Sequence, residues 1–436
     1  MRLHPLILIG LLLPFANGCA PPEARFVLSE DTGALEEDNA AGLVAGTLDA
    51  NFGTPQALVA WEELPVDFGR IEGRVLRATS QADQLLVSLP ENPGLNLVDL
   101  SLVFTSGGYQ AVQTHVAAFD AASRTLTLAD ALDSPPASGD TFAIVGHVLR
   151  RGRREYMHHC MHCHGVSGDG NGPTARYLNP RPRDYRRGEF KYTSTKDGFR
   201  ASRQDLKRTI QHGLMGTYMP SFQLLADEQL DAIIEYVRWL AMRGELERVL
   251  VSELGANSIE QVEGKTALYV DIIASNWRDA EDAGNMFMPT SPRVADTYDS
   301  RKRGFDLFNS DTGKCHTCHG PAGRGNGIET ETRQKDEKTK VVNQERGLYD
   351  DWGNPLRPRD LQSGIYRGGR RPLDIFRRVS VGIKGARMPG FATLKEKQRW
   401  DLVNYVLSIP IDGPTPIPHK KLTADAHGHD HMTGRN

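Results

Sequence analysis

The pattern of hydrophobic and polar residues changes character several times along the chain. Residues 6–13 form a short apolar run, and residues 20–40 are polar without a periodic pattern. From about 65 to 148, short β-branched runs alternate with turn sequences, which predicts a small antiparallel β-sandwich or barrel. Further on, apolar residues recur at helical spacing, most clearly over 227–240 and 395–407. The pattern therefore predicts a multidomain protein in which a small β domain precedes mainly α units.

These changes divide the chain into seven predicted segments. A length of 436 residues is enough for about three domains of roughly 150 residues each. No stretch reaches the roughly 18 consecutive apolar residues of a membrane-spanning helix, so we expect a soluble chain or one anchored only at an end. The segments are a signal peptide (1–18), a tether (19–64), the β-sandwich or barrel module (65–148), a first helical unit (149–242), a helical connector (243–300), a second helical unit (301–410) and a disordered tail that contains histidines (411–436).

The N-terminus has the features of an export signal. Arg2 and His4 precede the apolar residues 6–13, a run too short to span a membrane. The sequence Ala16-Asn17-Gly18-Cys19 that follows resembles the cleavage site of bacterial lipoproteins, and ordinary cleavage nearby is the alternative. We predict lipidation at Cys19 and an extracytoplasmic location, periplasmic and lipid-anchored to a membrane.

Charge is segregated along the chain, although the net charge is only −3. Residues 1–150 contain 7 Arg and Lys against 18 Asp and Glu, a net charge of −11. Residues 151–210 contain 14 against 6, a net charge of +8. The β region has no cysteine and two histidines, His115 and His147, and no cluster of convergent polar residues, so its sequence favours a spacer or a docking module over a catalytic domain. The basic stretch is either a solvated face or a landing site for an acidic redox partner.

The chemistry-bearing motif of the chain occurs twice. Cys160-Met161-His162-Cys163-His164 returns as Cys315-His316-Thr317-Cys318-His319. A C-x-x-C-H sequence is the attachment signature of c-type haem, in which two thiols bond to the haem and the following histidine coordinates the iron. Half a zinc site or a redox dithiol would also use C-x-x-C, but four of the five cysteines belong to the two complete motifs. We therefore predict two covalent haems, with His164 and His319 as iron ligands.

The sequence around the two motifs is one repeat. The shared features are a glycine four residues before an aromatic, a glycine-rich loop, an Arg-Pro-Arg-Asp sequence, a Met-Pro pair and a closing amphipathic helix. In chain order they are Gly152 and Tyr156, 165–172, 181–184, 219–220 and 227–240 in the first copy, and Gly304 and Phe308, 320–327, 357–360, 388–389 and 395–407 in the second. This series resembles tandem class I cytochrome c domains. The resemblance implies two mainly α cytochrome c domains, over 149–242 and 301–410.

The resemblance also implies the remaining site residues. In that family the first and last helices cross at a small glycine that faces an aromatic, which here maps onto Gly152 with Tyr236 and Gly304 with Tyr405. A methionine on a later loop is the second axial ligand, which maps onto Met219 and Met388, each followed by a proline that restricts the backbone. Met215 and His212 are local competitors at the first haem, and Met286 and Met288 precede the second motif. Arginines that pair with the haem propionates are expected at Arg181, Arg183, Arg357 and Arg359.

Two charged or histidine-rich stretches carry no assigned chemistry. The second copy is 21 residues longer than the first between its first cysteine and the Asp of Arg-Pro-Arg-Asp (315 to 360 against 160 to 184), and we expect the insertion to be a solvated surface loop. The tail contains His427, His429 and His431, a weak metal site or simply a disordered end.

The sequence favours a di-haem c-type cytochrome that transfers electrons between extracytoplasmic redox partners in a respiratory chain. The alternatives are a di-haem peroxidase-like enzyme, which needs an open iron site, and a fixed haem subunit of a larger membrane oxidoreductase complex. The enzyme assignment stays open, with an electron carrier favoured because the Met-Pro repeat fills both iron sites. The expected partners are redox proteins, including a membrane respiratory complex, and the membrane itself through the lipid. Nothing in the sequence indicates nucleic-acid binding.

Overall fold

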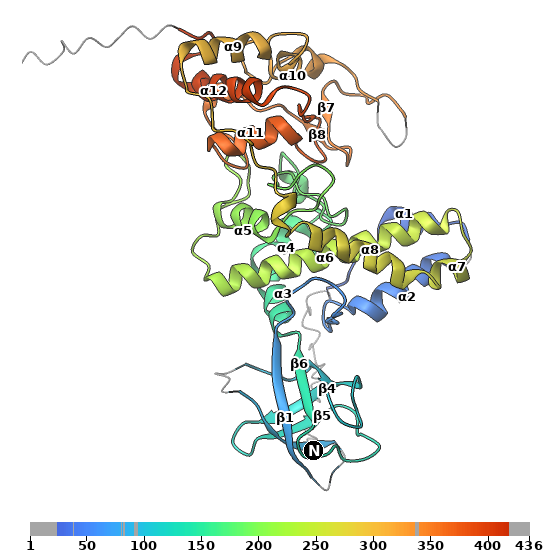
Figure 1. Cartoon of the computed structure of the whole chain (residues 1–436). Helices are drawn as coiled ribbons and strands as arrows, with labels where there is room; N and C mark the ends of the chain where they lie inside the picture. The colour runs from blue at the N-terminus through green and yellow to red at the C-terminus, as the bar shows by residue number, and fades with distance from the viewer. Residues whose placement is uncertain are drawn as a thin grey trace, which may run out of the picture.

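The computed structural model describes residues 24–37, 39–79, 81, 83–90, 95–335 and 340–417. The predicted signal peptide, Cys19 and the tail from residue 418 onward lie outside the described residues. Figure 1 shows a β-barrel at one end of the molecule, a long helical unit in the middle and a second helical unit at the other end. None of the helices in these described ranges is long and apolar enough to cross a membrane.

The β region is a closed six-stranded antiparallel barrel with the strand order β1-β2-β5-β4-β3-β6. Successive residues of a strand point to opposite faces, so Leu126 and Leu128 of β5 enter the buried interior together with Val116 of β4. The predicted small antiparallel β domain is confirmed, and of the two predicted alternatives, a sandwich or a barrel, the structure shows the barrel. Its strands are β1 (Arg70–Ala78), β2 (Gln84–Ser88), β3 (Ser101–Phe104), β4 (Gln113–Asp120), β5 (Thr125–Leu128) and β6 (Thr141–Val145).

The prediction of a tether over 19–64 is wrong for the described part of that segment. After a short helix α1 (Glu30–Gly33), helix α2 (Ala40–Phe52) packs against the middle unit. Val44, Leu48 and Phe52 are buried at a spacing of four residues, which places them on one face of the helix. Their apolar face has a partner only because the chain folds back onto the middle unit.

The first unit is built on two crossing helices, α3 (His147–His159) and α6 (Asp227–Leu254). They cross at Gly152, where an added Cβ would lie 2.1 Å from the carbonyl oxygen of Ala232 and 2.8 Å from the Cβ of Tyr236. The predicted contact of Gly152 with Tyr236 is therefore present. Along the chain, α3 is followed by α4 (Met161–His164), η1 (Ala175–Tyr177) and α5 (Arg203–His212) before α6 begins.

The predicted connector over 243–300 is not a separate segment. Helix α6 continues past residue 242 to Leu254, and α7 (Ile259–Glu263) and α8 (Thr266–Asp279) belong to the same buried core. Trp277 of α8 is fully buried there, and its indole N–H donates to the Glu245 carboxylate at 2.8 Å. The extension of α6 supplies the apolar surface that α2 and α8 cover.

The second unit repeats the helix crossing of the first. Helices α9 (Tyr298–Phe308) and α12 (Glu396–Asp412) meet at Gly304, where an added Cβ would lie 2.1 Å from the Asp401 carbonyl oxygen and 2.7 Å from the Cβ of Tyr405. The predicted contact of Gly304 with Tyr405 is therefore present as well. The other elements from the end of α8 onward are η2 (Ala283–Asn285), α10 (Cys315–His319), η3 (Ile328–Glu331), β7 (Leu348–Tyr349), β8 (Pro355–Leu356), η4 (Leu361–Ser363) and α11 (Pro372–Val381).

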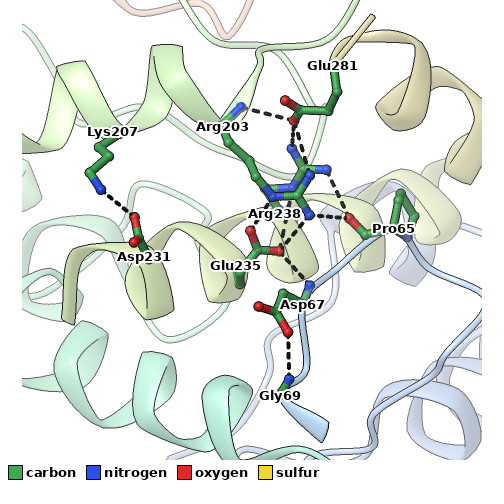
Figure 2. Close-up of polar contacts among 9 residues, drawn as sticks. All are labelled: Pro65, Asp67, Gly69, Arg203, Lys207, Asp231, Glu235, Arg238 and Glu281. Carbon is green, nitrogen blue, oxygen red and sulfur yellow. Dashed lines mark hydrogen bonds and ion pairs between the residues drawn. The ribbon is translucent and has the colours of Figure 1, made fainter. Parts of the chain in front are cut away.

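A cluster of charged side chains ties the barrel to the first unit (Figure 2). Arg238 of α6 is fully buried and donates to Glu281 at 2.5 Å and to the Pro65 carbonyl at 3.0 Å. Glu235 of the same helix accepts from Arg203 at 2.5 Å and from the amide of Asp67 at 2.8 Å. Because Pro65 and Asp67 lead into β1, these bonds fix the segment that enters the barrel. Where the chain leaves the barrel, β6 passes directly into α3 through Gly146.

Candidate functional site

The first Cys-x-x-Cys-His sequence forms a tight turn at the end of α3. The amide of Cys160 still bonds the Tyr156 carbonyl at 2.8 Å, and the short helix α4 then brings His164 back beneath the turn. The His164 ring is stacked on Tyr185 with 4.8 Å between ring centroids, and its Nδ1 lies 3.3 Å from the Arg183 carbonyl oxygen. Burial lowers the pKa of His164 to about 4. The neutral ring, with Nδ1 bonded to the carbonyl, keeps Nε2 available as a metal ligand.

The second motif has the same arrangement. Cys315 to His319 form α10, and Nδ1 of His319 lies 3.1 Å from the Arg359 carbonyl oxygen. Burial lowers the pKa of His319 also. The same ring nitrogen is therefore bonded to the same position of the Arg-Pro-Arg-Asp sequence in both copies.

The glycine-rich loops allow this carbonyl to reach the histidine. Gly170 has φ +73°, and an added Cβ would lie 2.7 Å from the Pro182 carbonyl oxygen. Gly325 has φ +71°, and its added Cβ would lie 2.3 Å from the Pro358 carbonyl oxygen. Only glycine adopts this conformation readily and leaves room for so close a backbone approach. The repeated glycines thus leave room for the backbone of the Arg-Pro-Arg-Asp sequence, and that sequence supplies the carbonyl that bonds the histidine.

The two predicted axial methionines lie on equivalent loops. The Met219 carbonyl accepts from the Leu214 amide at 3.1 Å, and the Met388 carbonyl accepts from the Ile383 amide at 3.0 Å. Met219 is half-buried and packs against the same core as Cys160. Met215, the local competitor, is 66 % exposed. Of the other methionines, the sulfur of Met286 accepts from the Ser194 hydroxyl and that of Met288 from Arg377.

A cavity of about 520 Å³ contains the second set of predicted site residues. It is lined by Cys315, Cys318, His319 and Met388. Its volume falls within the roughly 300–1,000 Å³ of small-molecule and cofactor sites, and such sites are mostly apolar. Phe308, Leu402 and Val406 supply apolar wall, and Arg357 and Arg359 also line the cavity. This cavity brings the two thiols, the oriented histidine and the methionine to one space of cofactor size.

The four predicted arginines fall into two classes. Arg181 and Arg357 are exposed. Arg183 is largely buried where the units meet, stacks over the Trp352 ring at 3.8 Å and donates to the Lys384 carbonyl at 3.4 Å. Arg359 donates to the Ile365 carbonyl at 2.8 Å, and its guanidinium lies 2.9 Å from where a Cβ on Gly216 of the first unit would stand. The second arginine of each Arg-Pro-Arg-Asp sequence therefore reaches the other unit, at the loop that precedes its methionine.

Comparison with known proteins assigns the two helical units. Residues 149–241 and 302–410 match the family model of cytochrome c. The chain is therefore similar to cytochrome c over these two regions. Such regions imply covalently bound c-type haem and a role in haem-based electron transfer. No curated protein matches the sequence.

One solved structure is similar to part of the chain. It belongs to the reducing HAO-like protein complex Kustc0457/Kustc0458 of Kuenenia stuttgartiensis. The match has 24 % sequence identity and a TM-score of 0.43, and it covers 59 % of this chain and 95 % of the other.

Several residues around the cytochrome c regions were not found from the sequence. Lys191 and Tyr192 of the first region line the cavity of the second, and Arg367 and Arg378 lie beside them. Trp352 follows the insertion of the second region and lies between Arg183 and Arg187, 3.8 and 4.5 Å from the two guanidinium carbons. The insertion is mostly exposed, as expected, but its end contacts the first region. The only sequence signal for this contact was an aromatic residue, Trp352, next to the charged insertion.

Proposed function

We propose that this protein is a di-haem c-type cytochrome that passes electrons between redox partners outside the cytoplasm. The observation that carries the proposal is the repeated site: in both copies a Cys-x-x-Cys turn precedes a half-buried histidine whose Nδ1 faces a backbone carbonyl, at 3.3 and 3.1 Å. Once bound, a haem at each site supplies a one-electron couple between ferric and ferrous iron. The chain has to attach, orient and shield it.

The residues of each site divide this work. Cys160 with Cys163, and Cys315 with Cys318, would hold the haems covalently, and His164 and His319 would coordinate the irons through Nε2. Met219 and Met388 would be the further iron ligands, since both sit on loops whose backbone is closed by an equivalent hydrogen bond, and Met388 lines the same cavity as His319. If both methionines bind iron, no open site would remain for peroxide or another small substrate, which favours an electron carrier over a peroxidase-like enzyme.

Contact between the two units supports electron exchange within the molecule. Arg183 of the first unit donates to the Lys384 carbonyl, and Arg367 of the second donates to the Gly216 carbonyl at 3.2 Å. Lys384 and Gly216 lie four and three residues before the proposed axial methionines. The two sites thus face each other through the loops that carry their ligands.

The location and partners form part of the same proposal. The predicted export signal and the predicted lipidation at Cys19 support a periplasmic location with a lipid anchor in a membrane, where a respiratory redox protein or a membrane complex would be the partner. The intact mass of the purified protein tests the anchor, because an unmodified N-terminus beyond Cys19 contradicts it.

The haem content of the purified protein tests the number of sites. Pyridine haemochrome analysis should give two haems per chain, and one in the variant with Cys160→Ser and Cys163→Ser. The matching variant with Cys315→Ser and Cys318→Ser should also give one. A wild-type value near one haem per chain contradicts the di-haem proposal.

Optical spectra of the oxidised and reduced protein test the carrier role. The ferric protein should be low-spin and show the weak near-infrared sulfur-to-iron charge-transfer band, weakened in Met219→His and in Met388→His separately. Ready binding of carbon monoxide or cyanide, a high-spin haem, or peroxide turnover at an enzyme-like rate of about 10 s⁻¹ would favour the peroxidase-like alternative.

A further inference from the structure

The cavity at the second motif is not closed by its own unit alone. Lys191 and Tyr192, which precede α5 of the first unit, form part of its wall. The Tyr192 ring packs directly on Gly368 of the second unit, where an added Cβ would lie 2.4 Å from a ring carbon. A residue pair more than 120 positions before Cys315 therefore reaches the space beside it.

This part of the wall carries an excess of positive charge. Burial raises the pKa of Tyr192, while four nearby arginines oppose that shift: Arg378, Arg367, Arg183 and Arg359. Burial, together with Arg183 and Arg367, lowers the pKa of Lys191 to about 8. Asp350 offsets part of the charge, but buried cations normally need closer anionic partners.

Several donors in this cluster lack an acceptor. The buried Nε of Arg367, which lines the cavity, has no hydrogen-bond partner among the described residues. The same holds for the buried Nε and Nη1 of Arg183, which lies behind this wall and does not line the cavity itself. In the same described part of the chain, the Lys191 ammonium and the Tyr192 hydroxyl make no hydrogen bond or ion pair. Arg378 donates only to the carbonyls of Asp374, Arg367 and Gly369, which bear no charge. Buried donors without partners are uncommon in folded proteins, so this wall is suited to an anionic group.

We propose that the second haem is held by both units, with Lys191 and Tyr192 of the first unit binding its propionate carboxylates together with Arg359 and Arg367 of the second. The inference rests on the proposed function, because it needs a haem at Cys315, Cys318 and His319. A haem presents two carboxylates at one edge, and cationic donors bind carboxylates more strongly than neutral ones do. The first unit is then a structural part of the second haem site and not only a neighbour.

Removing one of these charges has a defined effect on the second haem. Ferric haem carries one more positive charge than ferrous haem, so a buried cation nearby disfavours oxidation. Lys191→Met should therefore lower the midpoint potential of the second haem. We expect the redox equilibrium constant to change by about threefold or more, which corresponds to about 28 mV at 59 mV per decade.

The experiment is a spectroelectrochemical titration of the full-length protein with both haems attached. Lys191→Met should lower one of the two potentials, and Lys191→Arg should keep it near the wild-type value because the charge is retained. Lys265→Met, which removes an exposed charge at the start of α8, is the matched control and should change neither potential. If Lys191→Met shifts neither potential more than Lys265→Met does, the proposal is wrong.

Single-haem proteins assign the shift to a site. With Cys160→Ser and Cys163→Ser only the second haem remains, and Lys191→Met should still lower its potential. With Cys315→Ser and Cys318→Ser only the first remains, and the same substitution should leave its potential unchanged. A shift confined to the first haem overturns the composite site. A wild-type protein without two low-spin haems would instead refute the proposed function, and its spectrum and haem content reveal this before any variant is made.

Discussion

Gly304 provides the most direct test of how the second unit is packed. In Gly304→Ala the new Cβ would lie 2.1 Å from the Asp401 carbonyl oxygen, whereas a carbon and a carbonyl oxygen normally approach to about 3.3 Å. The obstacle is backbone inside α12, so no side-chain rotation can relieve it. Helices α9 and α12 would have to separate by roughly 1 Å.

The cost of that separation follows from what the helices bury. Tyr405 packs on Phe305 and Phe308, with 5.5 and 5.3 Å between ring centroids, and a gap of 0.5–1 Å already removes about a quarter to a half of the dispersion attraction. Overpacking costs about 1–3 kcal/mol by itself. Alanine regains about 1 kcal/mol in helix propensity. Because the obstacle is backbone, we take the upper end of the overpacking cost and expect a net loss of about 2 kcal/mol, which for a unit of this size lowers the melting temperature by roughly 8 °C.

Calorimetry of the protein with its haems attached measures this loss in the transition of the second unit. Gly46→Ala is the matched control, because Gly46 is an exposed position inside α2 with nothing within 4 Å of the added Cβ. That variant should be unchanged or more stable by up to about 1 kcal/mol. If Gly304→Ala melts within about 2 °C of Gly46→Ala, the close helix crossing does not control stability and the reasoning fails.

Two further predictions concern charged groups. Glu235→Gln should destabilise the first unit by about 2–3 kcal/mol in urea unfolding, because it removes the buried carboxylate that accepts from Arg203 at 2.5 Å and lies 4.0 Å from the fully buried Arg238. Asp231→Asn, which weakens the exposed pair with Lys207 in the same view (Figure 2), should cost no more than about 1 kcal/mol, and equal losses would contradict the assignment. At the start of α12, partial desolvation raises the pKa of Glu396, but hydrogen bonds from Ser291 and Thr290 outweigh it and lower the pKa to about 2. The lowered pKa stabilises the fold above the ordinary glutamate pKa, and this contribution is lost as the pH falls toward 2. Wild type should therefore be more stable than Glu396→Gln at pH 7 and equal to it near pH 2, and a difference that does not change with pH would contradict the shift.

The sequence by itself determined the parts of this protein that depend on local spacing. The two Cys-x-x-Cys-His turns place their thiols and histidine within a few residues, so the attachment chemistry is readable without a fold. The contacts of Gly152 with Tyr236 and of Gly304 with Tyr405 were also predictable, because the resemblance to class I cytochrome c implied them at matching positions of both copies. Alternating short runs were sufficient to predict a small antiparallel β domain, but they did not decide between a sandwich and a barrel.

Only the tertiary structure decided the roles of segments whose partners are distant in the chain. Helix α2 looked like part of a tether, because its narrow apolar face finds its partner only in the distant helix α6, where Phe52 packs on Trp239 with 5.2 Å between ring centroids. Lys191 and Tyr192 looked like members of a basic surface stretch, because nothing near them in sequence indicates the cavity of the second unit. Their burial depends on the docking of two units through loops far apart in the chain. Local patterns specify turns and helix faces, but which of those faces meet depends on long-range packing.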